Sequence, residues 1–142
     1  MRRTALDSAL AVVFLMANLG VAAQLDTPHA ANSVVVIEGR LRHKQVYGPP
    51  GWGETPRLDS KFTVYYLELR QAMSPQQLKL PPSKHADNSY SQVQLYCEFE
   101  GCDEFMRKHS NHIVLASGSA AYALEPNDVY PVTMTVAAMG TK

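Results

Sequence analysis

The sequence predicts a small all-β protein, a five-stranded barrel of the OB type with one short helix between its third and fourth strands. Five segments alternate apolar and polar residues with a period of two, and only one short segment has a helical charge pattern. Gly39 and Gly118 lie inside the first and fourth of these segments, as expected for the kinks or bulges of tightly coiled barrel strands. An open sandwich of the same strands is the alternative.

The first predicted strand covers 33–44, where Val35, Ile37 and Leu41 share one face of the period-two pattern. Residues 45–60 hold three glycines and three prolines and are predicted to form a long ordered loop. The aromatic and β-branched segment 61–70 is the second predicted strand.

The second half of the chain supplies the other elements. A short helix could begin at Ser74 and would end before Pro81, and a solvated loop follows it. In the third strand, 91–97, the inward residues are predicted to be Val93, Leu95 and Cys97, and the outward ones Gln92, Gln94 and Tyr96. The later elements are predicted as a helix over 103–109, with acidic residues first and basic residues last, and strands over 111–124 and 129–138.

The N-terminal residues indicate export. Arg2 and Arg3 precede an apolar run over 9–19, and small residues end the segment at Ala23, as a signal peptidase requires. We therefore expect a cleaved signal peptide (1–23), a flexible mature N-terminus (24–32) and a single β-barrel domain (33–140) in the periplasm or outside the cell. The apolar run is too short to span a bilayer, so no stable membrane insertion is expected.

The formal net charge is +0, with 13 basic and 13 acidic residues. A neutral chain lacks the basic footprint of a nucleic-acid-binding protein, and export argues against nucleic acid as well. We expect recognition by local patches of the surface rather than by long-range electrostatic steering.

The only two cysteines, Cys97 and Cys102, are predicted to form a disulfide, because an oxidising compartment joins closely spaced thiols. The alternative is a zinc site that adds His109 and His112, although this spacing is too short for a common zinc finger. For these histidines we favour charge matching at the end of a helix over metal binding.

The sequence contains no convincing catalytic constellation. Ser117-Gly118-Ser119 lacks a nucleophile elbow, and no phosphate-binding loop or dinucleotide fingerprint is present. The remaining histidines fall in segments predicted as tail, strand edge and loop. We therefore expect a protein that is not an enzyme and that needs no cofactor or metal.

The chain contains several short motifs: Ile37-Glu38-Gly39-Arg40-Leu41, Gly48-Pro49-Pro50, Glu54-Thr55-Pro56, Val114 to Gly118, and Tyr130 to Val136. Together these motifs resemble a family of small exported bacterial domains classified only as a domain of unknown function. That family often has a His-rich loop before the last strand, where this chain has Glu125-Pro126-Asn127-Asp128, so a ligand held by those histidines does not carry over. Some relatives are fused to segments that resemble lysozyme-inhibitor lipoproteins, which by analogy implies binding or inhibition of envelope enzymes.

The strongest candidate for recognition is the loop over 47–57, which contains the only tryptophan, Trp52. A rigid aromatic residue on a loop restricted by glycines and prolines is typical of interface anchors. In an OB-type barrel this loop commonly forms a binding rim with the loop before the last strand. The predicted partner-binding residues are Tyr47, Trp52, Glu54, Arg57, Tyr122 and Tyr130. Alternatively, Trp52 folds back and plugs the barrel end.

Two functions fit these observations. The first is an exported, non-catalytic protein-binding module, in its most specific form an inhibitor or immunity protein that neutralises an envelope-acting toxin or hydrolase. The second is a periplasmic protein that binds or senses a small ligand, sugar or metal through the same rim.

Overall fold

The computed structural model describes residues 33–84, 87–125 and 127–142. The predicted signal peptide and the segment 24–32 lie outside the described residues. The elements follow one another as β1 (Val34–Tyr47), β2 (Lys61–Met73), β3 (Tyr90–Cys97), α1 (Cys102–Lys108), β4 (Ile113–Tyr122) and β5 (Val132–Thr141). This order agrees with the sequence prediction, including a single short helix between the third and fourth strands. Among the described residues, no helix is long and apolar enough to cross a membrane.

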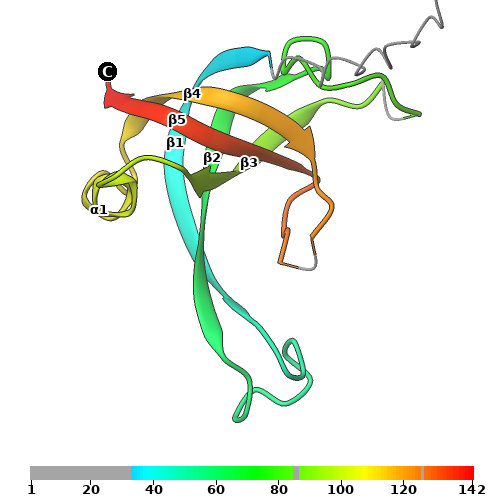
Figure 1. Ribbon diagram of the computed structural model, residues 1–142, viewed down its shortest axis with the longest axis vertical. Helices are drawn as coiled ribbons and strands as arrows, with labels where there is room; N and C mark the ends of the chain where they lie inside the picture. The colour runs from blue at the N-terminus through cyan, green and yellow to red at the C-terminus, as the bar shows by residue number, and fades with distance from the viewer. Residues whose placement is uncertain (1–32, 85–86, 126) are drawn as a thin grey trace, which may run out of the picture.

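The five strands close into a ring in the order β1-β2-β3-β5-β4 (Figure 1). Strands β3 and β5 run parallel, and the other neighbouring pairs are antiparallel. Because β1 also pairs with β4, the sheet has the closed OB-like topology that the sequence predicted. The alternative of an open sandwich is therefore wrong.

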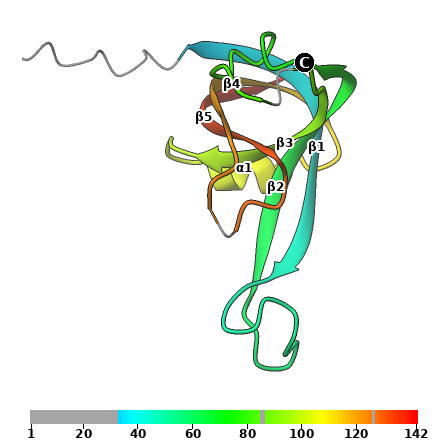
Figure 2. The same cartoon turned by 90° about the vertical axis from the view of Figure 1, so that its right-hand side faces the viewer.

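Strand β1 closes the ring because it pairs with two neighbours along different parts of its length. It pairs with β4 from Val34 to Arg40 and with β2 from Gly39 to Tyr47. The distal parts of β1 and β2 leave the barrel together as a long hairpin (Figure 2). The prediction ended the first strand three residues early, at Lys44, and began the loop at 45; the second strand likewise continues to Met73.

The two strand-interior glycines have different roles. Gly118 marks a bulge in the pairing of β4 with β5, as predicted, and a Cβ added to it would overlap the carbonyl oxygen of Thr135. No bulge occurs at Gly39, where the pairings continue without a register shift. A Cβ there would lie 3.0 Å from the carbonyl oxygen of Glu68, so Gly39 permits the close approach of β2 where β1 passes from one neighbour to the other.

Along each strand, apolar side chains that point into the ring alternate with side chains on its outer surface, as the period-two pattern predicted. The segment after β2 also contributes to the interior. Residues 74–79 form a turn instead of the possible helix, and Leu78 and Leu80 are buried in the core. The buried strand residues of this core include Val35, Ile37, Leu41, Leu67, Val93, Leu95, Val114, Val132, Met134 and Val136.

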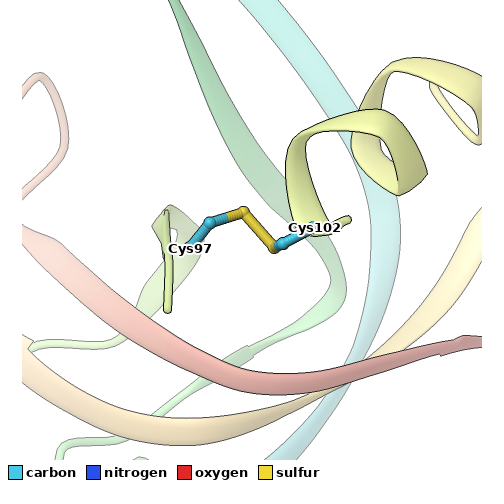
Figure 3. The surroundings of a disulfide bond; sticks show 2 residues. All are labelled: Cys97 and Cys102. Carbon is cyan, nitrogen blue, oxygen red and sulfur yellow. A yellow bond between two sulfur atoms is a disulfide. The ribbon is translucent and has the colours of Figure 1, made fainter. Parts of the chain in front are cut away.

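Cys97 at the end of β3 and Cys102 at the start of α1 form the predicted disulfide, with an S–S distance of 2.03 Å (Figure 3). Because both thiols are consumed in this bond, they cannot act as the thiolate ligands of the alternative zinc site. The helix keeps the predicted charge order, with Asp103 and Glu104 in its first turn and Arg107 and Lys108 in its last.

Replacing both cysteines by serine is expected to lower the free energy of unfolding by about 2 kcal/mol, since the bond restricts the unfolded chain. Urea unfolding of the oxidised protein and of the double variant measures the difference. Reduction of the wild-type protein should shift its midpoint to that of the variant. A chelator should leave the wild-type midpoint unchanged; a chelator-induced loss of stability would contradict the disulfide as the only cross-link here.

Candidate functional site

The hairpin of β1 and β2 projects from the barrel, and the loop 48–60, which we call the tip, lies at its far end (Figures 1 and 2). The two strands stay paired up to Tyr47 and Lys61, the last residues before the tip. Trp52 lies in the tip and does not belong to the apolar core. The alternative in which Trp52 plugs the barrel end is therefore wrong.

One carboxylate organises the backbone of the tip. The side chain of Asp59 is buried and accepts hydrogen bonds from the N–H groups of Gly51 (2.7 Å), Gly53 (2.7 Å) and Thr55 (3.2 Å). The Thr55 hydroxyl donates a fourth bond to it, at 2.8 Å. Several N–H donors converging on one carboxylate resemble the backbone nests that hold anions, so Asp59 fixes the shape of the tip from inside.

The other backbone donors of the tip are also satisfied within the hairpin. Among the non-proline residues of 48–60, all of them described, only Arg57 has an N–H group without a hydrogen bond of this kind. Burying an N–H group that has no hydrogen-bond partner costs about 1–3 kcal/mol. Because the N–H groups of the tip are already bonded within the hairpin, burying the tip in an interface avoids this cost. The remaining donors bond to carbonyl oxygens: Gly48 to Ser60, Trp52 to Gly48, Glu54 to Gly51, Leu58 and Asp59 to Thr55, and Ser60 to Pro49.

The backbone of Trp52 has a left-handed conformation, with a φ of 50°. Such a conformation is unfavourable for a bulky residue and persists only where the surrounding structure fixes it. Gly53 follows with a φ of 102°, which a glycine adopts without strain. The tip therefore holds the backbone of Trp52 in a conformation that the local sequence alone would not select.

The apolar side chains of the tip are exposed. Leu58 is 75% exposed and Trp52 is 47% exposed. Residues 55–58 line a shallow depression of about 500 Å³. Large apolar side chains exposed on a rigid protrusion are characteristic of interaction sites, whereas a single exposed apolar residue is ordinary.

The pKa of Asp59 reflects its position in the tip. Burial raises the pKa, but the hydrogen bonds from Thr55, Gly53 and Gly51 outweigh burial and lower it below the ordinary value of 3.8. Because the folded-state pKa is lowered, the contribution of this carboxylate to tip order is complete above pH 3.8. It is lost as the pH falls through the folded-state pKa.

Asp59→Asn is expected to loosen the tip at neutral pH, because an amide presents N–H groups where backbone N–H groups already point. The fluorescence anisotropy of Trp52, the only tryptophan, reports this change directly. The wild-type anisotropy should fall only in acid, whereas the variant should be low throughout. Glu54→Gln, which removes an exposed carboxylate of the same tip, is the matched control and should behave as the wild type. Equal anisotropy of Asp59→Asn and wild type at neutral pH would contradict the role of Asp59.

Four of the six predicted partner-binding residues lie at or beside the tip. Trp52, Glu54 and Arg57 belong to it, and all three are exposed. Tyr47 ends β1 just before it, also exposed, with the ammonium group of Lys61 5.1 Å from the centre of its ring. These residues come together on one protrusion.

The two remaining residues, Tyr122 and Tyr130, lie elsewhere. The ring of Tyr130 packs against Tyr66 at 4.6 Å, with the ammonium of Lys44 4.6 Å from its centre, at the base of the hairpin. Tyr122 packs edge-on against Tyr90 at the beginning of β3. Both tyrosines flank the loop between β4 and β5, as expected. That loop lies apart from the tip (Figures 1 and 2), so the expected rim of two adjacent loops is not formed.

The loop before the last strand is ordered by an aspartate of its own. The Asp128 carboxylate accepts hydrogen bonds from the N–H groups of Leu124 (2.7 Å) and Glu125 (2.8 Å) and from the hydroxyl of Tyr96. Burial and the adjacent Asp128 raise the pKa of Tyr96 to about 12. Gln94, predicted to point outward, is buried beneath this loop, and its side-chain oxygen accepts a bond from the N–H of Val129.

The three described histidines, His43, His109 and His112, form no metal cluster. His43 Nδ1 lies 2.8 Å from the hydroxyl of Ser110, but within the described chain no carboxylate bonds to this imidazole. His109 stacks on Phe105 and its Nδ1 lies 2.9 Å from the Phe105 carbonyl oxygen, as expected for a histidine that ends a helix. In the parts that the structure describes, no three His, Cys, Asp or Glu side chains form a group that could hold a metal ion.

The sequence indicated the tip through Trp52 but missed Asp59 and Leu58, which complete it. An aspartate that closes a loop of glycines and small hydroxyl residues is a weak signal in a sequence, since its partners depend on the loop conformation. No protein-family model matches this chain, and no curated protein or solved structure shows significant similarity to it.

Proposed function

We propose that this protein is an exported, non-catalytic binding module that recognises another protein through the tip of the β1–β2 hairpin. The observation that carries this proposal is the exposure of Trp52 and Leu58 on a backbone whose N–H groups are almost all satisfied internally. Binding such a tip removes apolar surface from water and leaves almost no buried backbone N–H group without a hydrogen bond. Its rigidity also reduces the ordering cost of association.

The shape of the site favours a concave partner surface. A narrow hairpin end offers little area if it rests on a flat surface, but it can be enclosed by a cleft (Figure 2). Clefts of this kind hold the active sites of hydrolases, and their occupation blocks substrate. We therefore infer that the protein is an inhibitor or immunity protein that neutralises an envelope-acting toxin or hydrolase, in agreement with the family resemblance described above.

The signal-like N-terminus and the disulfide support the place of action. Disulfides persist in the periplasm and outside the cell, and the covalent bond between β3 and α1 suits these compartments.

Capture from an envelope extract tests the proposal. The immobilised protein is compared with Leu58→Ser, which alters the tip, and with Leu124→Ser, which alters an equally apolar residue that is 88% exposed on a different loop. We expect one protein to be retained by the wild type and by Leu124→Ser but not by Leu58→Ser. If that protein is a hydrolase or toxin, its activity should fall in proportion to the protein added, up to one equivalent. Equal retention by all three resins would contradict recognition through the tip.

A further inference from the structure

The half of β1 that precedes Gly39 has an edge that no other strand of the described residues covers. Its pairing with β2 begins only at Gly39, whereas its pairing with β4 already begins at Val34. The N–H and C=O groups of successive strand residues point to opposite edges. Leu41 donates to the carbonyl of His112 and accepts from the N–H of Asn111, so odd-numbered residues of β1 bond toward β4. Val34, Val36 and Glu38 therefore direct their backbone groups toward the uncovered edge.

Two exposed valine side chains and one lysine ammonium lie beside this edge. The side chains of Val34 and Val36 are 55% and 61% exposed on the outer face of the sheet. The ammonium of Lys79 lies on the edge itself and donates a 2.6 Å hydrogen bond to the carbonyl of Val34. No described backbone group outside β1 and its neighbouring strands bonds to Val36 or Glu38. An exposed strand edge with apolar side chains is a template for another strand.

We propose that a second copy of this chain pairs with this edge, so that two β1 strands meet antiparallel about a twofold axis at Val36. In that register Val36 faces Val36 of the second copy, and Val34 faces Glu38 of the second copy. Each facing pair can exchange both backbone hydrogen bonds, because these residues direct their N–H and C=O groups outward. The apolar pair lies at the centre of the interface.

The charges favour a second copy over an unrelated strand. Lys79 sits beside the Val34 carbonyl, so in the twofold register it lies next to Glu38 of the second copy. As the incoming N–H group takes the carbonyl, the ammonium can move to that carboxylate. Glu38 Oε2 already accepts a 2.9 Å bond from Lys142 of the same chain, so the Lys79 ammonium of the second copy would bond to Oε1 of this carboxylate. The twofold axis creates this Lys–Glu contact twice. Opposite charges on neighbouring strands stabilise pairing, and like charges destabilise it.

The proposed contact is compatible with recognition through the tip but does not depend on it. The N-terminal half of β1 and the tip lie at opposite ends of the molecule (Figure 1). Pairing there leaves both tips accessible, so a dimer would present two recognition sites to its surroundings.

Sedimentation velocity over a dilution series of the purified protein tests the inference. We expect a concentration-dependent equilibrium between monomer and dimer. Val36→Lys should remove the dimer without lowering the melting temperature, since the side chain is on the outer face. Leu58→Lys, an apolar-to-basic change at the tip, is the matched control and should dimerise as the wild type. A wild-type protein that is monomeric at every concentration, including one that captures a different protein on this edge, would overturn the proposal.

Exchange of the charges provides a second, independent test. Because Lys142 bonds to Glu38 within the chain, the exchange is made in a Lys142→Ala background. There Glu38→Lys and Lys79→Glu should each weaken the dimer roughly tenfold, because each places like charges across the interface. The double variant should recover the dissociation constant of that background. A dimer that persists in Val36→Lys, or two weak single variants without recovery in the double variant, would show that the copies meet on another surface.

Discussion

Gly118→Ala is expected to lower the free energy of unfolding by about 3 kcal/mol, at the upper end of the effects of overpacking. The added Cβ would overlap the carbonyl oxygen of Thr135 and crowd the Cα of Val136, both on β5. Backbone atoms of a paired strand cannot rotate away as a flexible side chain can. Strand β4 would have to separate from β5 at the bulge, and this separation opens the ring at one of its five junctions.

Gly140→Ala is the matched control for this prediction. Gly140 lies on β5 and pairs with Leu115 of β4, so it belongs to the same two-strand ladder. A Cβ added at Gly140 meets no atom within 4 Å. Urea unfolding should show a change of less than about 0.5 kcal/mol for Gly140→Ala, as for ordinary surface substitutions. If the two variants unfold at similar denaturant concentrations, close packing at the bulge does not hold β4 against β5.

The fold was predictable because each strand signals its buried face through alternation. Val35, Ile37 and Leu41 are all buried, as the period-two pattern required. The ends of strands were less predictable, since a strand continues as long as a neighbour pairs with it. Residues 45–47 resemble loop residues in sequence, yet Tyr47 remains paired with Lys61 because the hairpin extends beyond the barrel.

The candidate site was predictable only in part, for a related reason. A lone tryptophan among glycines and prolines is visible in the sequence, so Trp52 was identified. The role of Asp59 arises only when the chain turns back and brings three N–H groups to its carboxylate. Gln94 was assigned to the outer face by alternation and does lie there, but the loop before β5 covers it. Tertiary contacts of this kind have no local signature.

Trp52→Ala is expected to weaken binding of the protein captured through the tip by at least ~2 kcal/mol, the usual threshold for a dominant interface residue. The loss follows from removing a large apolar surface that the rigid tip holds in place. The free energy of unfolding should change by less than about 0.5 kcal/mol, because the ring lies outside the core. Isothermal titration with the purified partner and urea unfolding of the same variant measure both quantities.

The binding affinity and the free energy of unfolding together show whether Trp52 is a recognition residue or a structural one. Trp52→Phe keeps an aromatic ring on the same backbone and should recover part of the lost affinity, whereas Asp59→Asn keeps the ring but loosens its support. If the tip binds as a rigid unit, Asp59→Asn should weaken binding as well, through a higher ordering cost rather than through lost contact area. A Trp52→Ala variant that is destabilised by roughly 3–5 kcal/mol, as truncated core aromatics are, and that binds with unchanged affinity would remove the tip from the functional site.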